Sequence, residues 1–136
     1  MVLIASPWNN PLILTRAWCL LEIFTSLQFE VATTFQAPVK LFVKIPSTEV
    51  SCFEKGIQAD PRCILAVLSN IQAQKASAAS AIDLQMIFRM IKDTDGGFAR
   101  INNEVKKAMR LWYVSTLNNL LKNPLFAEDF HFIHSF

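Results

Sequence analysis

The segment SPWNNPLILTRAWCLLEIF, residues 6–24, decides the fold that we expect, because it joins a predicted strand to a predicted helix. The run VLIAS, Val2–Ser6, is apolar without alternation and ends at Pro7, which is typical of a strand buried on both faces of a parallel sheet. Thr15 is a candidate N-cap for a helix that continues to about Phe29. Apolar side chains surround nearly the whole circumference of this helix, which predicts burial on most sides.

A single carboxylate, Glu22, lies in the middle of that apolar helix. Arg16 is six residues earlier and does not share its face, so a local salt bridge does not explain the acid, whereas Trp18 does share its face. Burying an unpaired carboxylate is costly and either raises its pKa or requires a dedicated partner, so such acids are functional candidates. The alternative is a structural acid that reaches the surface or caps a neighbouring loop.

Composition excludes several classes of protein. The chain has 136 residues, enough for one domain, with 52% hydrophobic and 18% charged residues, which is too apolar for a disordered tail. A net charge of +2 gives no reason to expect nucleic acid, and the apolar runs are too short to span a membrane. The first residues lack the basic start of a signal peptide. We therefore expect a cytoplasmic protein without nucleic-acid partners or membrane insertion.

Cysteine and glycine usage narrows the chemistry further. Cys19, Cys52 and Cys63 are odd in number and have no metal-type spacing, which predicts reduced and mostly buried thiols. Only three glycines occur, and neither a GxGxxG nor a Walker loop is present. A self-contained nucleotide-binding domain of either type is therefore not expected.

The rest of the chain reads as one further strand followed by helices. Periodicity, proline and capping signals predict these elements: a strand at Val39–Ile45, a helix capped by Ser47 and ending near Gln58, a helix from Asp60–Pro61 to Leu68, a loop at residues 70–80, a helix capped by Ser80 and Asp83 and ending near Lys92, a stop at Gly96–Gly97, and a long helix at Phe98–Leu121.

Two of these helices carry apolar stripes that we expect to face the core. The stripe of the fourth predicted helix consists of Ile82, Met86, Ile87, Met90 and Ile91. The stripe of the long helix consists of Ile101, Val105, Met109, Trp112, Leu117 and Leu120, and Lys106, Lys107 and Arg110 form a solvated flank.

Two candidate metal motifs are weak. The segment Asp93–Glu104 has acids at positions 1, 3 and 12 of a calcium loop, but Phe98 stands where the loop needs glycine. His131 and His134 are three residues apart in the tail and have no clear third ligand. We expect no metal site and no bound cofactor.

The order strand, Ser-Pro, short loop and TRAWCLLEI resembles the middle of a Toll/interleukin receptor (TIR) domain. The matching residues are Ser6, Pro7, Trp18, Cys19, Leu20, Glu22 and Ile23. The whole stretch is most similar to a TIR-like domain of protist and algal proteins that also carry kinesin-light-chain-like or nephrocystin-like tetratricopeptide repeats. Weaker similarity continues through FEVA at 29–32, GFARINNEV at 97–105 and LWYV at 111–114.

The resemblance implies a flavodoxin-like α/β fold in which helices cover a parallel sheet. It implies that Glu22 is the catalytic acid of the NAD-cleaving members, with NAD as the substrate. Trp18 and Ser6 become candidate substrate-binding residues on the same basis. A carboxylate among apolar groups would stabilise an oxocarbenium-like centre as nicotinamide leaves.

The sequence also departs from the family. The family's first strand, first helix, second strand and following loop have no counterpart, so we expect an N-terminally truncated domain at residues 1–121 and a divergent or flexible tail at 122–136. We predict a signalling or scaffold domain with protein partners, either homotypic or tetratricopeptide repeats. The alternatives are NAD glycohydrolase activity in the full-length parent and a non-functional gene fragment.

Overall fold

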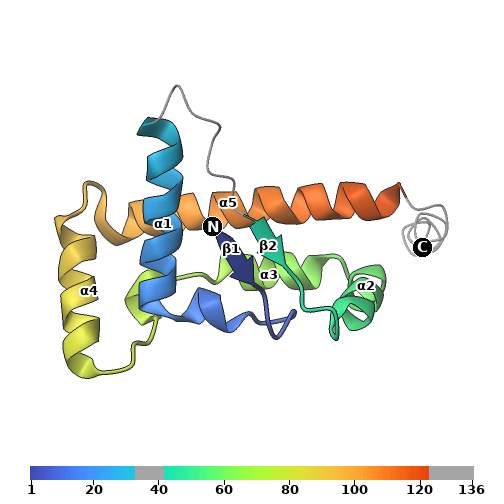
Figure 1. Cartoon of the computed structure of the whole chain (residues 1–136), viewed down its shortest axis with the longest axis horizontal. Helices are drawn as coiled ribbons and strands as arrows, with labels where there is room; N and C mark the ends of the chain where they lie inside the picture. Colours follow the sequence, from blue (N-terminus) through green and yellow to red (C-terminus); the bar gives the residue numbers. More distant parts are fainter. Residues whose placement is uncertain (33–41, 123–136) are drawn as a thin grey trace.

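The computed structural model describes residues 1–32 and 42–122. The fold is mixed α/β and mostly helical, with a small parallel sheet and a long C-terminal helix (Figure 1). The elements are β1 (Val2–Ile4), η1 (Leu12–Thr15), α1 (Ala17–Ala32), β2 (Phe42–Lys44), α2 (Val50–Ala59), α3 (Arg62–Ser69), η2 (Ala73–Lys75), α4 (Ala81–Asp93) and α5 (Gly97–Leu121). The predicted tail at 123–136, with both histidines, lies outside the described residues.

The two strands pair in parallel, with α1 crossing between them, as the apolar run at the start of the chain suggested. The predicted burial of β1 on both faces is wrong. Leu3 and Ala5 are buried, whereas Val2 and Ile4 are 63% and 47% exposed, because one face of the sheet is uncovered by the described residues. Of the second predicted strand, Phe42–Lys44 form β2, Ile45 lies just beyond its end, and residues 39–41 lie outside the description.

The start of α1 differs from the prediction. Thr15 is the last residue of the 3-10 turn η1, and its hydroxyl donates to the Leu12 carbonyl at 2.7 Å instead of capping the helix. Arg16 separates η1 from α1, and its carbonyl accepts from Leu20 N. On either side of this residue, the backbone of Ser77 bonds to Thr15 and Ala17 at 2.9 Å, which fixes the helix start against the loop before α4.

The predicted helices after β2 are present with shifted starts. Ser47 does not cap α2, which begins at Val50 after a turn closed by Glu49 N and the Pro46 carbonyl. The start of α3 is as predicted within two residues, and Asp60 accepts from Arg62 N at 3.0 Å.

The predicted Ser80 cap of α4 and the glycine stop after this helix are confirmed. The Ser80 hydroxyl accepts from Asp83 N at 3.1 Å, and Gly96 ends the turn after α4 with a left-handed φ of 84°. Gly97 begins α5, so Asp93–Glu104 is the end of one helix, a tight turn and the start of the next.

The core is built around α5, against which α1, α3 and α4 pack (Figure 1). The buried residues of α5 are Ile101, Asn102, Val105, Met109 and Tyr113. Of the predicted stripe, Trp112, Leu117 and Leu120 are only partly buried, and Tyr113 was not predicted. The buried Asn102 accepts from Ala73 N and donates to Gln74, both at 2.8 Å, so η2 is held against α5 by satisfied polar groups.

The start of α5 is joined to α1 by one arginine. Arg100 donates to Gln28 at 2.9 Å and to the Asp95 carbonyl at 3.0 Å, and its guanidinium lies 5.3 Å from the centre of the Phe24 ring. None of the helices in the described ranges is both long and apolar enough to cross a membrane.

Candidate functional site

The helix α1 has a buried side and an exposed side, which corrects the expectation of burial on most of its circumference. Its buried residues are Ala17, Leu20, Leu21, Ile23 and Phe24. Trp18, Glu22 and Thr25 are exposed on the opposite side, with Trp18 46% exposed. The alternative reading of Glu22, as an acid that reaches the surface, is therefore the one that the structure supports.

Glu22 and Trp18 nevertheless line one hollow. This groove has a volume of about 570 Å³ and is lined by Met1, Trp18, Leu21, Glu22, Thr25, Ser26 and Met90. Most of its lining comes from α1, and Met1, just before β1, and Met90 of α4 supply the rest. Within the described residues Glu22 has no hydrogen bond or salt bridge, so its carboxylate is free to meet a ligand.

Ser6, the third predicted site residue, does not line this groove. Its hydroxyl donates to Glu49 Oε2 at 2.5 Å, and Trp8 N donates to Glu49 Oε1 at 2.9 Å. Glu49 thus joins the loop after β1 to the start of α2. Sequence reasoning missed this acid, because its partners lie more than forty residues away and no local pattern marks the pair.

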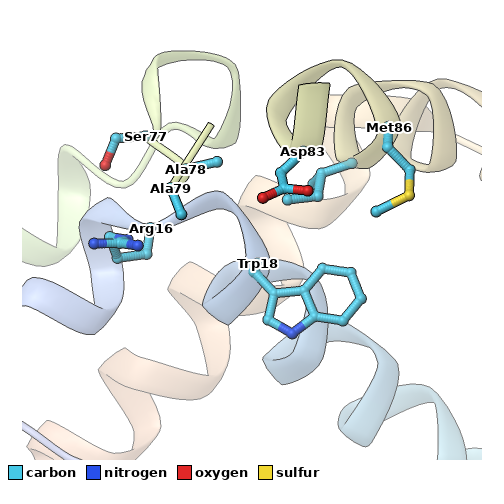
Figure 2. A pocket seen from close by; sticks show the side chains of 8 residues that line it. Arg16, Trp18, Ser77, Ala78, Ala79, Asp83 and Met86 are labelled. Carbon is cyan, nitrogen blue, oxygen red and sulfur yellow. The ribbon is translucent and has the colours of Figure 1, made fainter. Parts of the chain in front are cut away.

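Trp18 also lines a second hollow of about 330 Å³ (Figure 2). Figure 2 shows Trp18 on the α1 side and Asp83 and Met86 on α4, with Arg16 and Ser77 at the far end. Arg16 and Asp83 form no salt bridge, although both line the hollow. Trp18 therefore lines both cavities. Among the described residues, the groove contains one charged side chain, Glu22, and the second hollow contains a base and an acid, Arg16 and Asp83.

Exposed apolar side chains continue across both hollows, and we name this surface the apolar face. It consists of Met1, Trp18, Ile82, Met86 and Met90. The groove joins Met1 to Trp18 and Met90, the second hollow joins Trp18 to Met86, and Ile82 lies one helical turn before Met86. The surface therefore extends from the start of β1 across α1 to α4, whereas Val2, Ile4 and Phe42 are exposed on the open face of the sheet.

The apolar face also corrects the prediction for α4. Of the predicted core stripe, Ile87 and Ile91 are buried, whereas Ile82, Met86 and Met90 are 78%, 50% and 44% exposed. The helical period identified an apolar arc correctly, but only one edge of that arc meets α5 and α1.

The thiols are less buried than predicted, and Cys52 is exposed. Cys19 is partly buried beside Glu22. Burial raises the pKa of the Cys19 thiol, and the Glu22 carboxylate raises it further, so the thiolate is disfavoured. Cys19 is thus poorly suited to nucleophilic chemistry. No group of three or more metal-ligating side chains gathers anywhere in the described residues.

Comparison with protein-family models, curated proteins and solved structures gave no match to this chain.

Proposed function

We propose that this chain is a TIR-like, flavodoxin-type module of a cytoplasmic signalling or scaffold protein, and that it acts by binding other proteins. The observation that carries the proposal is the apolar face. Single exposed apolar residues are common, but a contiguous surface of this kind on a monomer marks an interaction site. Its three methionines add flexible, polarisable side chains that adapt to a partner's shape.

The arrangement of β1, α1 and β2 supports the fold part of the proposal. Two parallel strands joined by a helix form the βαβ unit from which flavodoxin-like sheets are built. The Ser-Pro pair follows β1 and the Trp-Cys-Leu-Leu-Glu stretch lies on α1, in the order that the TIR resemblance requires. The partners we propose are a second copy of the chain or a tetratricopeptide array.

Site-specific photo-crosslinking tests this function. A benzophenone amino acid is placed at Met86, within the apolar face, or at Lys107, an exposed position of α5 outside it. The purified chain is irradiated alone and with a purified tetratricopeptide array. Crosslinks from position 86 and none from position 107 are expected, and equal crosslinking from both positions, or none from either, contradicts the proposal.

A second candidate function, NAD cleavage, is favoured by one observation: Glu22 and Trp18 line the same groove. In that reaction the bond between the ribose carbon and the nicotinamide nitrogen breaks, and nicotinamide leaves with the bonding electrons. Water then adds to the ribose carbon and releases one proton to the solvent. The Glu22 carboxylate would stabilise the positive charge that develops on the ribose. Ser6 is not available for the same substrate, because it lies outside the groove and its hydroxyl donates a hydrogen bond to the Glu49 carboxylate.

The test is NAD turnover by the purified chain, alone and fused to any adjacent upstream sequence, beside Glu22→Gln. Asp93→Asn, at an exposed acid on α4, is the matched control. Turnover that Glu22→Gln abolishes and Asp93→Asn preserves would establish Glu22 as the catalytic acid. Absence of turnover in both folded preparations would leave Glu22 as a surface acid.

A further inference from the structure

The outer edge of β1 carries unused backbone groups. Phe42 N donates to the Met1 carbonyl at 3.0 Å, and Ala5 N donates to the Lys44 carbonyl at 2.9 Å. Alternate residues of a strand direct their peptide groups to opposite edges, so Val2 and Ile4 direct theirs away from β2. Within the described ranges these groups have no backbone partner.

The groove described above lies beside this edge. Met1 begins the ladder with β2 and also lines the groove, most of whose lining comes from α1. Figure 1 shows β1 between β2 and α1, so the outer edge of β1 faces the α1 side. A strand added at the usual interstrand spacing of about 4.8 Å would therefore lie over α1, with alternate side chains directed into the groove.

Within the described residues, the sheet has fewer strands and less cover over its faces than parallel sheets usually have. Such sheets are covered on both faces, and two strands alone are only marginally stable. Here Val2, Ile4 and Phe42 are exposed on one face, although their side chains are apolar. An added strand would extend both the ladder and this apolar surface.

We propose that the outer edge of β1 binds an extended segment of a partner protein by strand addition. The segment has apolar residues at alternate positions and one basic residue on the same face. The proposal rests on the proposed interaction function and narrows it to one occupant, an extended segment that lies outside the helical repeats of a partner protein. This strand pairs through its backbone with Val2 and Ile4 and inserts side chains between Trp18 and Met90.

The charge of Glu22 is the reason to expect a basic residue in the partner segment. Glu22 is the only charged side chain that lines the groove in the described part of the chain, and it has no salt bridge there. A lysine or arginine of the added strand would supply its partner. A second copy of this chain does not offer one from β1, because the strand Val2–Ile4 is uncharged. A segment of a different sequence therefore fits the groove better than the chain's own strand.

The probe is a seven-residue peptide with blocked ends. It has threonine at positions 2, 4 and 6, valine at positions 1, 5 and 7, and lysine at position 3. Binding to the isotopically labelled chain is followed by NMR, with the amides of Val2 and Ile4 as reporters. Two matched peptides are N-methylated, one at the odd and one at the even positions. One of them should bind at least tenfold more weakly than the parent peptide, and the other within about threefold.

The peptide that fails reports the direction of the added strand. Val2 and Ile4 face the open side of the sheet, so an added parallel strand bonds through its groove-facing odd residues and an antiparallel strand through its even residues. Equal affinity of the two methylated peptides, or no binding of the parent peptide, overturns strand addition.

A charge exchange tests the groove. Glu22→Lys should lower the affinity for the lysine peptide at least tenfold, and the variant should bind the matching glutamate peptide instead. An unchanged preference for the lysine peptide overturns the proposal. Because Glu22 is exposed, circular dichroism should show an unchanged fold. If no peptide binds but crosslinks still form from position 86, strand addition is wrong and the interaction function stands. If neither peptide binding nor crosslinking is seen, both proposals are wrong.

Discussion

Trp8 and Trp18 belong to two apolar regions with opposite surroundings. Trp8 meets Phe53 edge to face at 5.9 Å between ring centres, and Phe53 stacks on Trp112 at 6.4 Å. Together with Tyr113 these residues form an aromatic cluster covered by α2 and α5. Trp18, in the apolar face, has no covering element among the described residues. Apolar side chains dominate both regions, so composition alone does not decide burial. Whether another segment packs over the apolar side chains does.

Alanine substitution at one buried and one exposed apolar residue should separate the regions most strongly. Phe53 is 4% exposed, so Phe53→Ala leaves a cavity between two indole rings and should lower the free energy of unfolding by about 3–5 kcal/mol. Ile82→Ala, at a residue that is 78% exposed, should change it by less than about 0.5 kcal/mol. Urea unfolding followed by circular dichroism measures both. Similar losses would mean that the apolar face is covered in solution.

Gly56 tests how tightly the aromatic cluster is closed. Alanine usually stabilises a helix over glycine by about 1 kcal/mol. At Gly56 an added Cβ would lie 2.2 Å from Cη2 of the Trp8 indole, so Gly56→Ala should instead destabilise by about 1–3 kcal/mol. Ser51→Ala on the exposed side of α2 is the control, with a gain of a few tenths, about 0.3 kcal/mol. A gain at both positions would show that the Trp8 ring moves freely.

The local signals of the sequence predicted the elements well where the determinants were local. The Ser80 cap, the Gly96 stop and the long helix α5 follow from side chains within one turn of the backbone that they control. Thr15 and Ser47 had equally good local chemistry and failed as caps. Contacts made elsewhere set those helix starts: Ser77 holds the residues on either side of Arg16, and a turn holds Glu49.

The candidate site was predictable only in part. The spacing of Trp18 and Glu22 placed both on one side of α1, and they do line one groove. The exposure of that side was not predictable, because apolar residues occur around the whole helix and only tertiary packing selects the buried arc. The same limit applies to α4, where Met86 and Ile87 are adjacent yet differ in burial. Ser6 was placed by resemblance alone, and its bond to Glu49 depends on a distant residue.

Tyr113 gives the aromatic cluster a measurable pH dependence. Its hydroxyl donates to the Pro61 carbonyl at 2.6 Å, so Tyr113→Phe should cost about 1 kcal/mol at neutral pH. Burial, then Cys63 and Asp60, raise the pKa of Tyr113 above its ordinary value of about 10. The contribution is therefore complete below about pH 10 and is lost as the pH rises beyond it.

Unfolding by urea at about pH 8 and about pH 11 measures this effect. The native protein should lose more stability between the two than Tyr113→Phe does. Because Tyr113 is the only tyrosine, tyrosinate absorbance reports its titration directly. An ordinary titration near pH 10 with the fold intact would show that the hydroxyl is open to water.

Neighbouring residues of α4 allow the most selective test, in which the methionine variants have the smallest expected effect on stability. Met86 and Met90 belong to the apolar face, whereas Ile87 and Ile91 are 2% and 0% exposed on the same helix. Met86→Gln and Met90→Gln should each change the free energy of unfolding by less than about 0.5 kcal/mol, because both methionines already contact water. Ile87→Gln and Ile91→Gln bury an amide without a partner and should each cost more than about 2 kcal/mol. If the methionine variants keep the fold but reduce crosslinking to a partner, the exposed side of α4 serves binding. If they destabilise the chain as the isoleucine variants do, the apolar face is part of the core, and the contrast with the aromatic cluster disappears.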